Sequence, residues 1–256
     1  MGGMIVLFTD FGTDADGPYV GQMTQRLHDE GGAAPFINLF HGVPPFDVEA
    51  GSHLLAAYGQ DMAAGAVVLA VVDPGVGGAR KPLMVRAGDR WFVGPDNGLF
   101  EIPLRRREED GLADWQAWEI TWRPAGELSA SFHGRDLFAP VAARLSRGVA
   151  PETLGRPIEG GAIRRPDWPG EVGRILHIDG YGNAVTGLRV RSLDLDAAIT
   201  LKGVEIRRKR TFSEGGGGEA FWYENASGLV EIAVNQASAA SALGLAPGVQ
   251  LVVTKV

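Results

Sequence analysis

Val67-Val68-Leu69-Ala70-Val71-Val72 is an unbroken apolar run, and it ends directly at the carboxylate of Asp73. Two more runs of this kind, Ile5 to Thr9 and Phe36 to Leu39, precede it in the chain. Continuous apolar strands are typical of sheets that helices cover on both faces, because neither face then meets water. The three runs therefore predict strands in the middle of a covered sheet.

Helical patterns fill the segments between and after these runs. Asp16 is placed to cap a first helix that carries Pro18 in its first turn and an apolar residue at every third or fourth position. Further helices are predicted over Asp47 to Tyr58 and over Arg135 to Arg147. Strands that alternate with helices build βαβ units. The first part of the chain is therefore predicted to be α/β, with a mostly parallel sheet flanked by helices.

The pattern changes after Gly148, where Gly and Pro interrupt the chain without a regular period. Beyond this stretch, short strands separated by Gly-rich turns are predicted over Val172 to Ile178, Ile199 to Ile206, Leu229 to Val234 and Val249 to Val253. Such a series is typical of a small all-β barrel. We expect an α/β N-terminal domain over residues 1–165 and a smaller C-terminal β-barrel domain over residues 166–256.

Composition excludes several classes of function. The chain has 256 residues, a formal net charge of -7 and no cysteine. An acidic chain lacks the positive face that nucleic acid binding requires, and the basic cluster Arg207 to Arg210 is explained more simply as a solvated turn or strand edge. Without cysteine, disulfides and cysteine-ligated metals are excluded. No segment resembles a membrane span or a signal peptide, so we expect a cytoplasmic protein with no membrane partner.

Polar residues follow two of the predicted strands at the point where each strand ends. Asp10 comes directly after the first run, and Asp73 opens a Gly-rich loop that ends at Arg80. Ligands collect at the carboxyl ends of parallel strands, because loops and helix N-termini converge there. Asp10 could cap a helix or accept hydrogen bonds from the two hydroxyls of a sugar. Asp73 and Arg80 could pair across their loop, either as a structural ion pair or as part of a site.

His133 precedes the third predicted helix, where the positive end of the helix dipole favours a neutral ring. A neutral ring can accept a proton, although a structural hydrogen bond is the commoner role of a single histidine. The other four histidines show no metal-binding spacing, so no metal is expected. Gly94 to Gly98 and Asp179 to Asn183 both have strong turn signals, which turn chemistry alone could explain.

Taken together and in this order, six motifs span most of the chain. They are Leu7 to Gly12 (LFTDFG), Tyr19 to Met23 (YVGQM), Val71 to Gly77 (VVDPGVG) followed by Arg80, Val93 to Gly98 (VGPDNG), Phe132 to Asp136 (FHGRD) and Asp179 to Asn183 (DGYGN). In these motifs the sequence resembles the S-adenosylmethionine hydroxide adenosyltransferase family, which is related to the fluorinase and chlorinase enzymes.

The resemblance implies an enzyme that hydrolyses S-adenosyl-L-methionine to adenosine and L-methionine without a cofactor. It further implies a homotrimer in which each site lies between the first domain of one subunit and the second domain of its neighbour. Asp73, Arg80 and His133 match the triad that activates water, and Asp10 matches the carboxylate that binds the ribose. Further substrate contacts are implied for Asp179 (methionine amine), Asn183 (adenine), Ser227, Glu231 and Val234.

One departure from the family pattern concerns the second domain. After the asparagine that Asn183 matches, the family usually continues towards Thr-Asn, whereas this chain has Thr186-Gly187. Glycine has no side chain, so any contact made by that second asparagine is missing here.

The implied reaction needs no general acid. The sulfur of a sulfonium leaves as a neutral thioether, so the enzyme mainly has to hold a nucleophile in line with the breaking carbon–sulfur bond. Such positioning can lower a barrier by about 7–11 kcal/mol at best. Two alternatives stay open at this point: a halide-dependent halogenase of the same superfamily, and a sensor that binds adenosine or S-adenosylmethionine without turnover.

Overall fold

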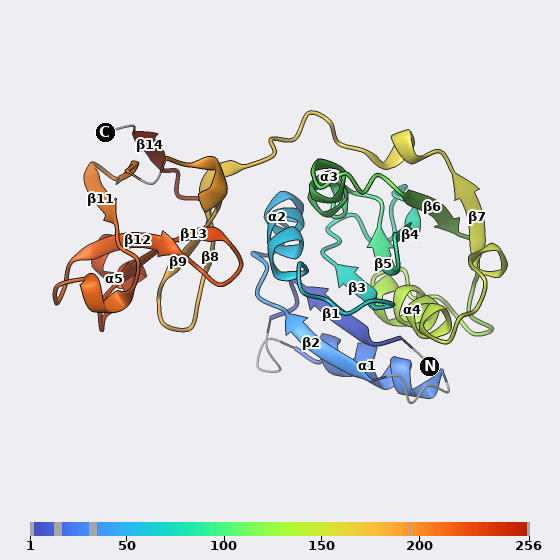
Figure 1. Cartoon of the computed structure of the whole chain (residues 1–256). Helices are drawn as coiled ribbons and strands as arrows, with labels where there is room; N and C mark the ends of the chain where they lie inside the picture. The colour runs from blue at the N-terminus through green and yellow to red at the C-terminus, as the bar shows by residue number, and fades with distance from the viewer. Residues whose placement is uncertain (1–2, 13–16, 31–34, 195, 255–256) are drawn as a thin grey trace. The chain divides into compact units, whose positions relative to one another are not determined.

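The chain divides into two compact units, Met1–Trp168 and Pro169–Val256. In this computed structural model, residues 3–12, 17–30, 35–194 and 196–254 are described, and Asp16, the expected helix cap, lies outside them. Each unit contains its own seven-stranded sheet (Figure 1). The overall α/β class is as predicted, with helices concentrated in the first unit.

The first unit alternates strands with helices. Its elements are β1 (Ile5–Thr9), α1 (Tyr19–Asp29), β2 (Phe36–Phe40), α2 (Val48–Tyr58), β3 (Val67–Val71), β4 (Pro82–Ala87), β5 (Arg90–Pro95), α3 (Glu101–Glu109), β6 (Trp115–Ile120), the π-helical turn η1 (Gly134–Phe138), α4 (Ala139–Ser146), η2 (Pro151–Thr153), β7 (Gly155–Ile158) and η3 (Gly160–Ile163). Asp47 caps α2, since its side chain accepts a hydrogen bond from the backbone N–H of Ala50 at 2.9 Å.

The sheet of the first unit is mixed, so the prediction of a mostly parallel sheet is wrong. Its strand order is β2-β1-β3-β5-β4-β6-β7. Strands β2, β1, β3 and β5 are parallel, whereas β4, β6 and β7 pair in antiparallel fashion. The direction changes because only Gly88 and Asp89 separate β4 from β5, and a two-residue connection cannot make the crossover that parallel neighbours need.

The central strands are buried on both faces, as the apolar runs predict. All five residues of β1 and of β3 are buried. Alternate residues of these strands, such as Leu7 and Leu69, pack against Met23 of α1 and Leu137 near α4. Helices α1 and α4 cover this face of the sheet, and α2 and α3 cover the other (Figure 1).

Strand β2 departs from the same prediction. It is one of the two edge strands of the sheet, and none of its residues is fully buried; Ile37 is 43% exposed. An apolar run does not distinguish an edge strand from a central one, because both can be rich in β-branched and aromatic residues.

The third predicted helix is divided in two. It begins as the π-helical turn η1, where the N–H of Ala139 donates to the carbonyl of Gly134, and continues as α4. Pro140 follows directly and has no N–H to donate, so the regular hydrogen-bond pattern is interrupted there. His133 stands immediately before this turn.

The second unit consists mainly of strands. Its elements are β8 (Val172–Ile178), β9 (Ala184–Arg189), η4 (Val190–Ser192), β10 (Ala198–Leu201), β11 (Val204–Arg208), η5 (Phe212–Glu214), β12 (Ala220–Glu224), β13 (Leu229–Val234), α5 (Ala239–Leu243) and β14 (Val252–Thr254). The predicted single strand from Ile199 to Ile206 is wrong. Lys202 and Gly203, with φ of 49° and 80°, form a two-residue turn, and β10 and β11 pair around it as a hairpin.

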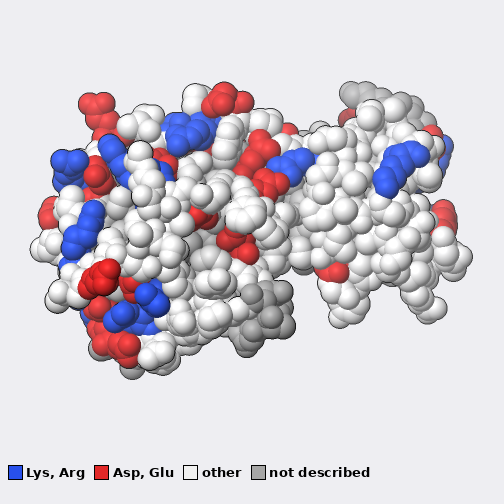
Figure 2. Space-filling view, turned by 180° about the vertical axis from the view of Figure 1, so that it is seen from behind, with Lys and Arg blue, Asp and Glu red and all other residues white. Residues whose placement is uncertain are grey.

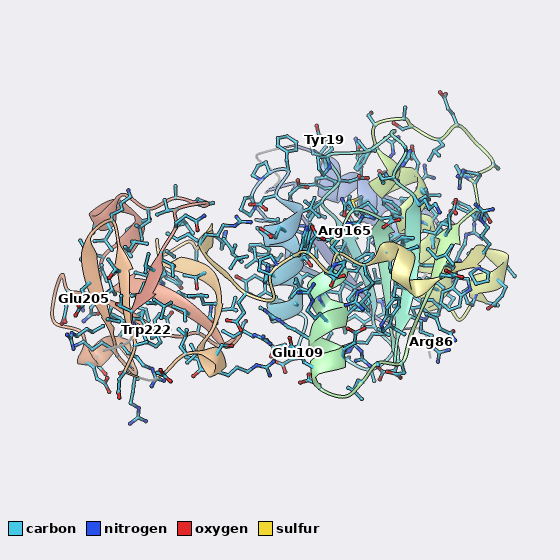
Figure 3. The ribbon with its side chains drawn as sticks, turned by 90° about the horizontal axis from the view of Figure 1, so that it is seen from above. Tyr19, Arg86, Glu109, Arg165, Glu205 and Trp222 are labelled. Carbon is cyan, nitrogen blue, oxygen red and sulfur yellow. The ribbon has the colours of Figure 1, made fainter. Side chains whose placement is uncertain are left out.

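The sheet of the second unit curls into a half-barrel in the order β14-β10-β11-β12-β13-β9-β8. The predicted last strand, 249–253, is also divided: residues 248–251 exchange backbone hydrogen bonds with residues 173–175, whereas β14 pairs with β10. Trp222 is fully buried among the strands of this unit (Figure 3), and its indole N–H donates to the carbonyl of Ala197 at 3.1 Å.

Charged side chains are interspersed on the face that Figure 2 shows, with Lys and Arg next to Asp and Glu. In the predicted basic cluster, Arg207 pairs with Glu205 and Lys209 pairs with Glu219. Among the described residues, no helix is long and apolar enough to cross a membrane.

Candidate active site

The candidate site of the first unit lies at the carboxyl ends of β1 and β3. These strands are adjacent and parallel, with Thr9 opposite Val71. Asp10 directly follows β1, and Asp73 comes two residues after β3 ends. The register therefore brings both carboxylates to the same edge of the sheet, and the charge of Asp73 contributes to raising the pKa of Asp10, after the larger effect of burial.

Arg80 joins Asp73 to His133. Its Nε donates to Oδ1 of Asp73 at 2.9 Å, and its Nη2 donates to Oδ2 of the same carboxylate. Nη2 also lies 2.8 Å from Nδ1 of His133. The structure thus brings the three predicted triad residues together in one chain of hydrogen bonds, although Arg80 and His133 are 53 positions apart in the sequence.

The Asp73–Arg80 pair is almost completely removed from solvent. The exposed fraction of the side chain is 5% for Asp73 and 9% for Arg80. The guanidinium also lies over the ring of Phe138, 5.3 Å from its centre. A bidentate, buried pair of this kind has a fixed geometry, because both hydrogen bonds must be broken for either side chain to turn away.

The contact with Arg80 fixes the tautomer of His133. A guanidinium can only donate, so Nδ1 of His133 accepts and carries no proton. A neutral ring then has its proton on Nε2. Burial lowers the pKa of His133 below its ordinary value of 6.5, and the charge of Arg80 lowers it further, outweighing the opposite effect of Asp73. The ring is therefore neutral at neutral pH and presents an N–H at its far side.

Asp10 is fixed by a residue from another loop. Its Oδ2 accepts a hydrogen bond from the backbone N–H of Phe46 at 3.1 Å. Phe46 has a φ of 67°, unusual for a residue with a side chain, and its side chain is 74% exposed. Nearby, Oγ1 of Thr9 lies 2.8 Å from Nδ1 of His41, which ties the end of β1 to the loop after β2.

A cavity of about 430 Å³ opens between these loops. Asp10, Asp73 and His133 line it, whereas Arg80 lies outside its lining. Its walls also include four aromatic side chains, those of Phe11, Tyr19, Phe46 and Phe132. The volume and the mixture of aromatic and carboxylate groups suit part of a nucleoside-sized ligand.

The second unit carries a cavity of its own, of about 610 Å³. Of the residues predicted to bind substrate, Asp179, Asn183 and Val234 line it. Oδ1 of Asp179 accepts from the backbone N–H groups of Tyr181 and Asn183, and Oδ2 accepts from the side-chain amide of Asn183 at 3.0 Å. The turn from Asp179 to Asn183 is thus held in shape by the carboxylate of its own first residue.

Glu231 and Ser227 lie outside the lining of this cavity. Glu231 is buried, and its two carboxylate oxygens accept from the hydroxyl of Tyr223 and from the amide of Asn225. Burial and the neighbouring Glu231 carboxylate raise the pKa of Tyr223 well above its ordinary value. The backbone N–H of Ser227 donates to Asn225. In this arrangement Tyr223, rather than Glu231, faces the cavity.

Both units match sequence profiles of one protein family. The family profile for the SAM hydroxide adenosyltransferase N-terminal domain matches residues 5–155, and the profile for the C-terminal domain matches residues 173–252. The chain belongs to this family. An (R)-S-adenosyl-L-methionine hydrolase from Thermus thermophilus is 36% identical over 95% of this chain and 96% of its own length. A protein of the same name from Salinispora arenicola is 39% identical, over 96% of this chain and 95% of its own length.

A solved crystal structure has the same fold as this member of the family. The crystal structure of an uncharacterized conserved protein from Thermotoga maritima superposes with a TM-score of 0.83 at 30% identity, and the match covers 98% of this chain and 100% of that one. Both units therefore have counterparts in a known structure.

Three aromatic residues that line the cavities of this family member lie outside the motifs that its sequence offers: Phe46, Phe212 and Tyr223. The signal for Phe46 is the pair of prolines Pro44 and Pro45, which mark a loop at the end of the strand next to β1. Tyr223 lies in the run AFWYE, whose pattern predicts an aromatic strand and gives no sign of a binding site. Among the described residues, no group of three or more His, Asp or Glu side chains is placed to hold a metal ion.

Proposed function

We propose that this protein hydrolyses (R)-S-adenosyl-L-methionine to adenosine and L-methionine, with water attacking the 5′ carbon of the ribose. The names of its relatives support this substrate and this epimer. The observation that carries the proposal is the chain of hydrogen bonds from Asp73 through Arg80 to His133, which ends at a cavity that also contains Asp10. Asp10 would accept hydrogen bonds from the ribose hydroxyls.

The reaction balances without a cofactor. The oxygen of water forms a bond to the 5′ carbon, the carbon–sulfur bond breaks, and its electron pair stays with sulfur as the neutral thioether of methionine. One proton leaves from the attacking oxygen. Since the leaving group is neutral, no general acid is needed, and the enzyme acts chiefly by positioning.

The tautomer of His133 determines how it would act. With Nδ1 occupied by Arg80, the N–H at Nε2 would donate to the oxygen of the attacking water. The carboxylate of Asp73 lines the same cavity and could accept one of the hydrogens of that water. In this proposal His133 orients the nucleophile, Asp73 receives the proton, and Arg80 holds both side chains without touching the water.

The second cavity would bind the remainder of the substrate. Phe212 and Tyr181 offer aromatic faces on which a purine can stack, and Asn183 offers an amide for its edge. The single hydroxyl proton of Tyr223 is committed to Glu231, so its oxygen can only accept from an N–H group of the substrate. Ser227 and Glu231 would then support the site indirectly.

We also propose that the active enzyme is a homotrimer in which the first unit of one subunit and the second unit of its neighbour complete one site. The proposal is supported by the distribution of the candidate residues, because the triad and Asp10 belong to one unit, whereas Asp179, Asn183 and Val234 belong to the other.

The test is direct. The purified protein is incubated with each sulfonium epimer of S-adenosylmethionine, with and without chloride or fluoride, and the products are separated by chromatography. We expect adenosine and methionine from the (R) epimer, independent of halide. A halogenated adenosine that forms only with halide would indicate a halogenase, and tight binding with the ligand intact would indicate a sensor; either result would overturn the proposal.

A further inference from the structure

The loop that carries Asp73 and Arg80 has little support of its own. Residues 74–79 are mostly exposed, and its internal backbone bonds are short-range turns, from Val76 to Asp73 at 3.2 Å and from Gly78 to Gly75 at 3.0 Å. Asp73 and Arg80 nevertheless have to meet in a pair of hydrogen bonds, one to each carboxylate oxygen. Something outside the loop must therefore fix its two ends.

The turn from Gly94 to Gly98 contacts both ends of this loop. The side-chain amide of Asn97 donates to the carbonyl of Val72, the residue before Asp73, at 2.8 Å. The backbone N–H of Asp96 donates to the carbonyl of Lys81, the residue after Arg80, also at 2.8 Å. Oδ1 of Asn97 accepts from the N–H of Leu99 at 3.2 Å, which holds the amide in this orientation.

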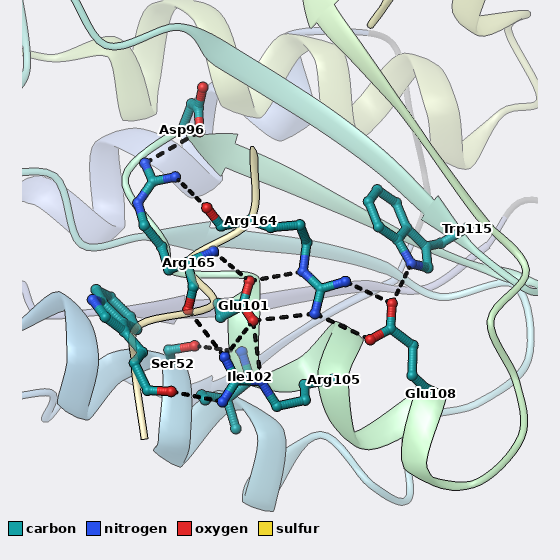
Figure 4. A network of polar contacts seen from close by, with 10 residues as sticks. Ser52, Asp96, Glu101, Ile102, Arg105, Glu108, Trp115, Arg164 and Arg165 are labelled. Atoms are coloured by element: carbon teal, nitrogen blue, oxygen red, sulfur yellow. Dashed lines mark hydrogen bonds and ion pairs between the residues drawn. The ribbon is translucent and has the colours of Figure 1, made fainter. Parts of the chain in front are cut away.

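The turn is itself anchored from the other side (Figure 4). Arg165 lies 3.6 Å from the carboxylate of Asp96, and its backbone N–H donates to Glu101 at 2.8 Å. Glu101 is buried, which by itself would raise its pKa, but hydrogen bonds from Arg164, Arg165 and Arg105 hold the pKa at about 2. Glu101 thus stays ionised and keeps the segment around Arg165 beside the turn.

We infer that Asn97 is a positioning residue for the reaction: by holding the Val72 carbonyl, it sets the direction in which Asp73 leaves β3 and meets Arg80. The inference rests on the proposed function of the triad. Turn chemistry alone would require only the bond to Leu99, whereas the bond to Val72 reaches 25 positions back to the strand that carries the site. A carboxylate displaced by about 1 Å can lower turnover about 100-fold.

Two substitutions separate the hydrogen bond to Val72 from the hydrogen bond to Leu99. Asn97→Asp and Asn97→Ser each keep an oxygen that can accept from Leu99, but neither supplies an amide donor to Val72. We expect kcat to fall by about 10- to 100-fold with little change in KM, because substrate-binding residues are untouched. The control is Ser52→Ala, which removes a buried hydrogen bond to Ile102 in the same unit, 3.0 Å long, and should lower Tm without lowering kcat.

A second readout is independent of turnover. The nitrogen-15 NMR shifts of His133 report which ring nitrogen carries the proton, and we expect both Asn97 variants to lose the fixed Nε2–H form, whereas Ser52→Ala keeps it. Unchanged kcat and unchanged His133 shifts in folded Asn97 variants would overturn the inference. If the unmodified protein does not hydrolyse S-adenosylmethionine, the proposed function fails, and the NMR shifts alone then decide whether Asn97 positions the triad.

Discussion

Replacing Asp73 with Asn tests whether the triad is held by a buried charge pair. The substitution keeps the size of the side chain but removes the negative charge that faces Arg80. Because the two side chains are only 5% and 9% exposed, solvent cannot take over the role of the missing partner. Breaking a buried pair by removing one partner typically costs about 3–5 kcal/mol. An amide oxygen still accepts one hydrogen bond, so we expect a value near the lower end.

This loss of stability should produce a measurable decrease in the melting temperature, Tm. For a domain of this size, a loss of about 3 kcal/mol lowers Tm by about 6–12 °C. Thermal unfolding followed by circular dichroism measures the shift, and chromatography of the reaction products measures turnover. We expect turnover to fall at least about tenfold in the same variant, because an amide cannot take up the proton and holds Arg80 by one hydrogen bond instead of two.

The double variant Asp73→Asn with Arg80→Met provides the control. Removing both partners leaves no unpaired buried charge, so Tm should recover part of the loss seen with Asp73→Asn alone, while turnover stays low. A Tm for Asp73→Asn within about 2 °C of the parent, or losses that simply add in the double variant, would refute the account of a buried pair.

Four further predictions follow from the geometry. Activity should fall as the pH drops through the lowered pKa of His133, below 6.5, because the protonated ring can no longer accept a hydrogen bond from Arg80. The free energy of unfolding should fall over the same range, because the unfolded chain binds this proton more readily than the folded protein does. A flat kcat/KM profile from pH 7 to 5 would contradict both expectations. His133→Gln, which keeps a hydrogen-bond donor near the Nε2 position, should retain more turnover than His133→Ala. Equal losses of turnover in the two variants would indicate that His133 acts as a base and not as a donor. Tyr223→Phe should raise KM more than it lowers kcat, and unchanged kinetics would remove Tyr223 from the site. If the proposed homotrimer forms, mixing His133→Ala with Asn183→Ala subunits should restore about a quarter of the activity, whereas sites formed within single subunits would regain none.

The part of the site that lies at the ends of strands can be predicted from the sequence. Asp10 and Asp73 follow continuous apolar runs, and adjacent parallel strands bring their ends together whatever the rest of the sheet does. The meeting of Arg80 with His133 is different, because no local pattern links positions so far apart. It depends on the loop after β3 and on the π-helical turn that begins beside His133.

Short turns decide two features that the sequence prediction missed. Gly88-Asp89 reverses the chain between β4 and β5, and Gly-Asp flanked by strand-like runs does signal a two-residue hairpin. Lys202-Gly203 splits an apparent strand, and Lys-Gly is not among the usual hairpin pairs, so this turn gives only a weak signal. The partners of Glu231 depend instead on cross-strand register. Tyr223 and Asn225 donate to its two carboxylate oxygens, and the sequence does not reveal the strand pairing that brings these side chains together.

In the proposed reaction, the triad directs a water molecule at the 5′ carbon of an adenosyl sulfonium. Incubation of the protein with (R)-S-adenosylmethionine in water enriched in oxygen-18, followed by mass spectrometry of the adenosine, tests it most directly. We expect one oxygen-18 atom in the 5′ hydroxyl of adenosine, and at least about tenfold less labelled product with Arg80→Met. Adenosine without the label, or labelled adenosine formed equally fast by the Arg80→Met variant, would contradict it.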